Sequence, residues 1–142
     1  TSHMSAYDEG GTIRAQQLEL LNSVIAEEYA KGNYVIVGGD FNHAMGEEVA
    51  EGFPSEQKFP ERVAVLTDED LTDGVRIVRA DNELEVPTCR GADIVYTKGV
   101  NYTTVVDGFL VTDNVRATAE NIDTDFAYSD HNPVKLQFEL IK

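Results

Sequence analysis

The chain has 142 residues, 42% of them hydrophobic, so it is long enough for one domain with a sizeable core and is not a disordered segment. Its single cysteine, Cys89, excludes an internal disulfide, and no apolar run approaches the roughly 20 residues that span a bilayer. The 26 acidic and 11 basic residues give a formal net charge of -15, and such a surface repels phosphate backbones unless metal ions or a basic patch intervene.

The first residues of the chain carry no recognisable targeting signal. Residues 1–4, Thr-Ser-His-Met, resemble the remnant of an expression tag, so we set His3 aside as a functional residue. We expect a single domain over residues 5–142.

The domain is expected to begin with a helix followed by a strand. Apolar residues recur at helical spacing over residues 12–31, with Thr12 as a cap at the start and Gly32 at the end. The run at 33–38 predicts a strand that ends on Gly38, and Gly39, Asp40 and Asn42 come soon after it.

The rest of the chain predicts a loop, a second helix and several strands. Residues 43–61 contain glycines and prolines and predict a long loop with at most a short turn of helix. A second helix is expected over residues 67–79, because Thr67 can cap it and acidic residues follow at its positive end. The remaining expected strands are residues 92–99, 103–112 and 132–142.

Groups that can carry chemistry stand at or near the ends of these strands. Asp40 and Asn42 follow the first strand, Asp107 lies within an apolar strand, and Asp130 and His131 precede the last one. Carboxylates with a histidine suit metal-assisted hydrolysis, in which they hold a hard cation, orient water and move a proton. Taken singly, each motif is also typical of an ordinary turn. Asp107 is the exception, because a carboxylate among apolar neighbours needs a partner, for which His131 is the natural candidate.

Together these motifs resemble those of one known family. "VIVGGDFN", "VVDGFLV" and "YSDHNPV", in this order, resemble the endonuclease/exonuclease/phosphatase family, which has the DNase-I-like α/β sandwich fold. The resemblance implies a divalent-metal-dependent phosphoric ester hydrolase that uses magnesium or manganese. It covers residues 12–142 and only the second half of the family's domain.

The resemblance also implies a role for each matching residue. Asp40 is expected to position or deprotonate the attacking water and to bind metal, and Asn42 to contact the scissile phosphate. His131 is expected to stabilise the transition state, Asp107 to hold His131 in orientation, and Asp130 to help bind the metal. These roles fit what phosphodiester hydrolysis requires, namely a positioned water and neutralised charge.

Other residues compete for these roles or border them. Asp93, in "GADIVY", is a rival for the place of Asp107, which we prefer because its strand leads on to His131. Thr88 matches a recurrent threonine of the family and is expected to be architectural. His43 is expected to be a solvated loop residue rather than a substrate contact. Two tyrosines are expected to pack rather than to form a substrate platform, Tyr96 and Tyr128.

The family pattern breaks upstream of these motifs. The first half of the family's domain supplies an asparagine, the main metal-binding glutamate and often a second histidine. No residue of this chain matches that half. A half domain would expose a large apolar face, so we expect pairing with an N-terminal half or a second copy and weak activity of the chain alone. The substrate is expected to be a small phosphoester, a phospholipid head group or a nucleic acid. The alternative function is a non-catalytic binding or assembly half of the fold.

Overall fold

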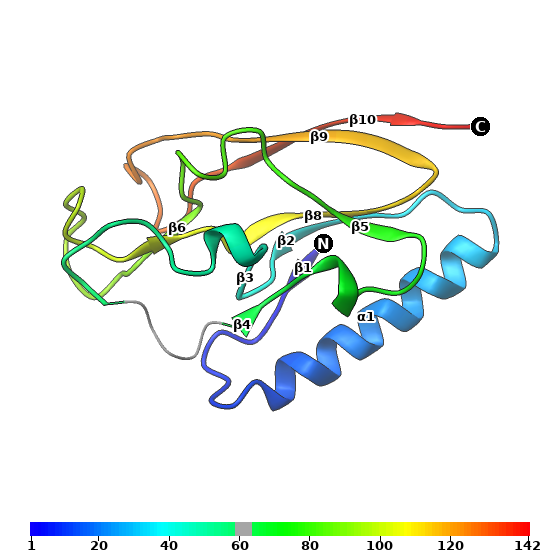
Figure 1. The fold of residues 1–142 in the computed structure, drawn as a ribbon, viewed down its shortest axis with the longest axis horizontal. Helices are drawn as coiled ribbons and strands as arrows, with labels where there is room; N and C mark the ends of the chain where they lie inside the picture. The colour runs from blue at the N-terminus through cyan, green and yellow to red at the C-terminus, as the bar shows by residue number, and fades with distance from the viewer. Residues whose placement is uncertain (59–63) are drawn as a thin grey trace.

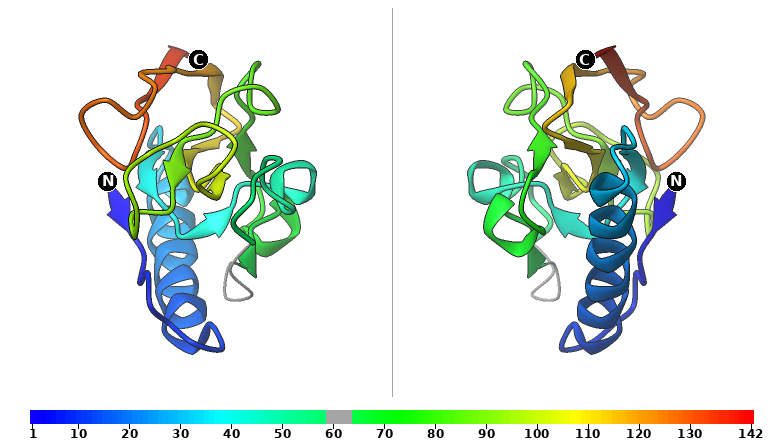
Figure 2. Two further views of the ribbon diagram at one scale, coloured as in Figure 1. Left: turned by 90° about the vertical axis from the view of Figure 1, so that its left-hand side faces the viewer. Right: turned by 90° about the vertical axis from the view of Figure 1, so that its right-hand side faces the viewer.

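The computed structural model describes residues 1–58 and 64–142. Its centre is a four-stranded sheet in the order β1-β2-β8-β5, in which β1 runs parallel to β2 and the other neighbours are antiparallel. Helix α1 lies along one face, and an antiparallel ribbon of β9 and β10 lies on the other side (Figures 1 and 2). The elements named here are β1 Ser2–His3, α1 Thr12–Ala30, β2 Ile36–Asp40, β5 Val75–Val78, β8 Asp107–Thr112, β9 Val115–Asn121 and β10 Val134–Leu140.

Both faces of the central sheet are apolar, and its register explains why. Val37 pairs with Leu110, and this row packs with Ile25 of α1 in one cluster. The next row, Ile36 with Val111, points to the opposite face and packs with the β9–β10 ribbon. Strands covered on both sides carry continuous apolar runs instead of an alternation, as β2 and β8 do.

Helix α1 forms where it was predicted but begins differently. Its N-cap is Gly11 in the left-handed conformation (φ 72°), so the expected cap by Thr12 is wrong. The Asp8 carboxylate instead accepts a hydrogen bond from the Arg14 backbone N–H (2.7 Å). Gly32, with φ 83°, follows the end of the helix as expected, because glycine adopts this conformation without strain.

The predicted helix over residues 67–79 is wrong. Only a short 3-10 turn, η2 Asp68–Asp70, forms there, and β5 follows it. Thr67 is the N-cap of this turn, as expected, and the side chain of Asp70 accepts the Thr67 backbone N–H. Gly74, with φ 77°, then turns the chain, and the apolar β-branched residues after it pair with β8.

Two other predicted strands differ from those observed. No strand forms within residues 92–99, where the Asn101 side chain holds a turn by accepting Thr97 N–H and donating to the Gly91 carbonyl. The strand expected over 103–112 is split into β7 Thr103–Thr104 and β8. The split arises because the carbonyls of Val105 and Val106 accept hydrogen bonds from the chain that follows β2.

The remaining elements are short and surround the end of the sheet where β2 stops. They are β3 His43–Ala44, η1 Glu47–Val49, β4 Ala64–Val65 and β6 Cys89–Arg90, and β6 pairs with β7. The short helical turn expected within residues 43–61 is η1, while positions 59–61 of that range lie outside the described residues. Within the described part of the chain, no helix combines the length and apolar character needed to cross a membrane.

The last strand forms as predicted, as β10, and part of its apolar side is uncovered. Val134 and Leu136 pack against the central sheet, whereas Phe138 and Leu140 are 57% and 47% exposed. The ribbon therefore carries an open apolar row at its far end, on the same side of β10 as its packed residues.

Leu110, which is 1% exposed, tests the packing of the central sheet. Leu110→Ala should lower the free energy of unfolding by about 2–5 kcal/mol, because it leaves a cavity beneath α1. Leu84→Ala is the matched control, since Leu84 is 65% exposed. Urea unfolding of both variants measures the difference, and equal losses would contradict this assignment of the core.

Candidate functional site

The pairing of β2 with β8 places two carboxylates side by side. Asp40 ends β2, Asp107 begins β8, and the two are direct partners in the antiparallel register. Both side chains lie on the face of the sheet that carries Ile36 and Phe109, away from α1, and their side chains are 14% and 17% exposed. Two carboxylates held this close, in partial burial, favour binding of a proton or a cation.

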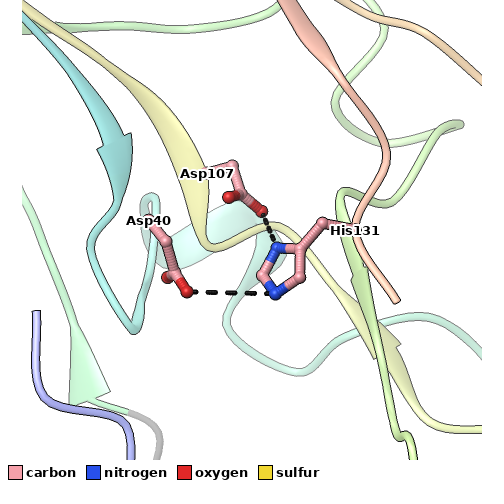
Figure 3. Close-up of side chains that lie close together, drawn as sticks. All are labelled: Asp40, Asp107 and His131. Atoms are coloured by element: carbon pink, nitrogen blue, oxygen red, sulfur yellow. Dashed lines mark hydrogen bonds and ion pairs between the residues drawn. The ribbon is translucent and has the colours of Figure 1, made fainter. Parts of the chain in front are cut away.

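His131 completes the group from a distant part of the sequence. It precedes β10 and forms an isolated bridge with Cys89, which fixes its backbone beside the end of the sheet. Its Nδ1 lies 2.8 Å from Asp107 Oδ2, and its Nε2 lies 3.9 Å from Asp40 Oδ2 (Figure 3). The expected contact between Asp107 and His131 is therefore present, and the imidazole lies between the two carboxylates.

The electrostatics of the group follow from these contacts. The hydrogen bond to Asp107, followed by the contact with Cys89, raises the pKa of His131 to about 11, so the ring is a cation at neutral pH. Burial is the main cause that raises the pKa of Asp40, and the charge of Asp107 adds to it. The imidazolium and the Asn42 backbone N–H act in the opposite direction on Asp40.

Asn42 is held beside Asp40 by a tight local turn. Its φ of 47° is left-handed, a conformation that asparagine tolerates better than most residues. Its backbone N–H donates to Asp40 Oδ1 (2.8 Å), and its Nδ2 donates to the Met4 carbonyl (2.8 Å). The backbone from Asp40 to Asn42 thus forms the ordinary turn that this motif also predicted. That turn places the Asn42 carboxamide beside Asp40.

Asp130 lies in the same cavity but outside the close group. Ligand atoms of Asp40, Asp107 and His131 all lie within 4.8 Å of one another, and Asp130 does not belong to this set. Asp130 and His131 nevertheless line one cavity of about 460 Å³ with Asp40 and Asn42. That volume suits a small ligand or one group of a larger one.

His3, which the sequence led us to set aside as part of a tag remnant, lies beside Asp40 in the structure. Strand β1 pairs in parallel with β2, His3 is the register partner of Asp40, and its Nε2 lies 3.4 Å from Asp40 Oδ2. The segment packs tightly against the sheet. Met4 is 2% exposed and belongs to the cluster that contains Val37 and Leu110. A Cβ at Gly39 would collide with the Ser2 carbonyl. A strand of two residues has no periodicity to detect, so only the pairing with β2 reveals it.

Thr88 is architectural, in the sense expected. It is fully buried, and its Oγ1 accepts hydrogen bonds from the backbone N–H groups of Val106 (3.0 Å) and Asp107 (3.1 Å). The hydroxyl therefore satisfies two adjacent amides where β8 begins and holds the backbone of Asp107 in place.

Asp93 and His43 lie apart from the close group. The Asp93 carboxylate accepts hydrogen bonds from Gln57 Nε2 (3.1 and 3.2 Å), so the structure pairs His131 with Asp107 and not with this rival. His43 is 7% exposed, which corrects its expected solvation, and its Nδ1 lies 2.6 Å from the Phe41 carbonyl. Burial lowers the pKa of His43.

The two tyrosines differ from each other. Tyr96 packs edge-on against Phe126 with ring centroids 4.9 Å apart, in agreement with the expected packing role. Tyr128 is 93% exposed, so its expected packing role is wrong. It precedes Ser129, whose Oγ accepts the His131 backbone N–H (3.1 Å).

The raised pKa of His131 predicts a specific titration. In EDTA, its imidazole should titrate far above 6.5, and Asp107→Asn should bring the pKa back toward 6.5 because the main cause of the shift is removed. A pH series of imidazole NMR spectra measures this, with His43 as the internal control. Titration of His131 near 6.5 in the unmutated chain would contradict the geometry.

The same shift predicts how stability depends on pH. A folded-state pKa above the unfolded value means that the contact stabilises fully below pH 6.5 and that this contribution is lost as the pH rises toward 11. The difference in unfolding free energy between the unmutated chain and Asp107→Asn should therefore be largest at about pH 6 and shrink in alkali.

Comparison with known proteins identifies the fold. No protein-family model matches the chain, and neither does any curated protein. The crystal structure of truncated Caenorhabditis elegans TDP2 aligns with 96% of this chain, with a TM-score of 0.56 and 19% sequence identity. The chain spans about half of that protein chain, 51%. This likeness confirms the expected fold class, a mixed α/β architecture of the DNase-I-like kind.

Proposed function

We propose that this chain is a divalent-metal-dependent phosphoric ester hydrolase, or the part of one that carries this site. One observation supports the proposal above the others: ligand atoms of Asp40, Asp107 and His131 lie within 4.8 Å of one another, and Asp40 and His131 line a cavity. The order of the three sequence motifs and the shared fold agree with it.

Asp40 is the proposed base that orients and deprotonates the attacking water. Burial raises its pKa, and this makes the carboxylate a stronger proton acceptor than an exposed aspartate. Asn42 is proposed to contact the phosphoryl group, and its hydrogen bonds to Asp40 and to the Met4 carbonyl hold it in place beforehand. His3, 3.4 Å from the same carboxylate, is a further candidate to contact substrate.

His131 is the proposed stabiliser of negative charge in the transition state. Its Nδ1–H is held by Asp107, which leaves Nε2 directed toward Asp40 and the cavity. A cationic N–H of this kind binds a phosphoryl oxygen most strongly when charge accumulates on that oxygen. Asp107 acts through His131, by fixing its ring and its protonation.

The donor set of the cavity fits a hard divalent cation. Carboxylate oxygens are the ligands that magnesium and manganese prefer, and we propose that Asp40 and Asp130 hold the ion. The Asp107 carboxylate already contacts His131 Nδ1, so we assign it the role of orienting the imidazole and not of binding the ion. A bound ion would neutralise charge on the phosphoryl oxygens and lower the pKa of a bound water.

We further propose that residues 5–142 act as the C-terminal part of a larger domain of this kind, with Ser2–His3 as an edge strand. The open apolar row at Phe138 and Leu140 supports this, because a missing half of the domain could cover it. The small cavity and the net charge of -15 favour a small phosphoester or a head group over a nucleic acid.

Hydrolysis of bis-p-nitrophenyl phosphate with magnesium or manganese tests the function. Turnover should be slow, should stop in EDTA, and should fall by roughly 100-fold or more in Asp40→Asn and in His131→Ala, because a proton acceptor or a charge stabiliser is lost. Asp93→Asn removes a carboxylate outside the close group and should keep the unmutated rate.

Two outcomes would count against the proposal. If turnover persists in EDTA, the reaction does not depend on a divalent metal. If Asp40→Asn turns over as fast as the unmutated chain, the reaction does not take place at Asp40. A complete lack of turnover, together with unchanged NMR signals around Asp40 and Asp130 when manganese is added, would favour the binding or assembly half instead.

A further inference from the structure

We propose that Arg90 forms an oxyanion-binding position in the cavity and receives the phosphate group of the substrate there. The inference rests on the proposed function and extends it, because it assigns recognition of the anionic group to a named side chain. The ligand class is a phosphate or a similar tetrahedral oxyanion.

The backbone ties Arg90 to the site. Its N–H donates to the Asp130 carbonyl (3.0 Å), and the preceding Cys89 forms the bridge with His131. Arg90 therefore belongs to the wall that carries Asp130 and His131, and it lines the same cavity as Asp40.

The guanidinium group is held in one orientation. Its Nη1 donates to the Gly91 carbonyl (3.0 Å), and its Cζ lies 5.9 Å from the centre of the Tyr96 ring. Tyr96 is in turn supported by Phe126, which is 5% exposed. A guanidinium fixed by a carbonyl and an aromatic ring loses little entropy when it binds a ligand.

Arg90 lacks an internal counter-ion. Arg79 and Arg116 each lie within 4.0 Å of a glutamate carboxylate, but among residues 1–58 and 64–142 no carboxylate lies that close to Arg90. Its Nε is buried and has no hydrogen-bond acceptor in that part of the chain. The charge of the guanidinium is therefore not neutralised by a neighbouring carboxylate and can attract an oxyanion in the cavity that Arg90 lines.

The acidic groups around the cavity explain why phosphate binding would need the positive charge of Arg90. The carboxylates of Asp40, Asp107 and Asp130 lie in or beside the cavity and outnumber the imidazolium of His131, and the net charge of -15 on the whole chain also repels an approaching phosphate. A fixed guanidinium on the same wall provides local attraction and a planar fork that matches phosphate geometry.

Binding of inorganic phosphate, measured by calorimetry with and without magnesium, tests the inference without any turnover. Arg90→Gln should weaken binding roughly tenfold or more, because a charge-assisted hydrogen-bonded pair is lost. Arg90→Lys should bind with intermediate affinity, since it keeps the charge but not the fork. Arg116→Gln removes the same charge from the exposed pair with Glu139 and should bind like the unmutated chain.

The outcomes separate this inference from the proposed function. Equal phosphate affinity in Arg90→Gln and Arg116→Gln would overturn the role of Arg90 even if Asp40→Asn and His131→Ala abolish turnover. Absence of phosphate binding by the unmutated chain in both conditions would overturn it as well. NMR spectra that show a folded core in each variant exclude unfolding as the cause, and selective loss in Arg90→Gln supports the inference.

Discussion

The antiparallel register between β2 and β8 is the constraint on which the site depends. It makes Asp40 and Asp107 direct partners on one face of the sheet, where a shift by one residue would send one carboxylate to the opposite face, under α1. The buried rows of both strands hold this register, because each apolar side chain must also find its own core. Packing far from the chemistry therefore sets the distance between the two acidic groups.

The rest of the site is brought to this pair by backbone contacts. Thr88 fixes the start of β8, the bridge between Cys89 and His131 fixes the imidazole, and the turn at Asn42 fixes the carboxamide. Each anchor is a hydrogen-bonded backbone group, so the side chains are positioned before any ligand arrives. Preorganisation of this kind is what electrostatic catalysis requires.

The sequence predicted the strongly periodic parts of the fold and the residues in recurrent motifs. The helix near residues 12–31 and the strand near 132–142 have clear periods, and the pairing of Asp107 with His131 follows from the cost of a carboxylate among apolar residues. The helix predicted at 67–79 does not form. The prediction gave more weight to the capping signals at Thr67 than to the β-branched residues after Gly74, which favour a strand. His3 was set aside because residues 1–4 resemble a tag remnant, and its place beside Asp40 is defined only by the pairing of its strand with β2, far along the chain.

The absence of room at Gly39 has a consequence for how this chain can vary. A side chain there would meet the Ser2 carbonyl, so β1 can lie beside β2 only while position 39 stays glycine. The substitutions that the fold accepts at position 39 therefore depend on whether residues 2–4 still pair with β2. In a library that varies both segments, larger residues at 39 should survive only in members that have given up the edge strand, and with it the imidazole beside Asp40.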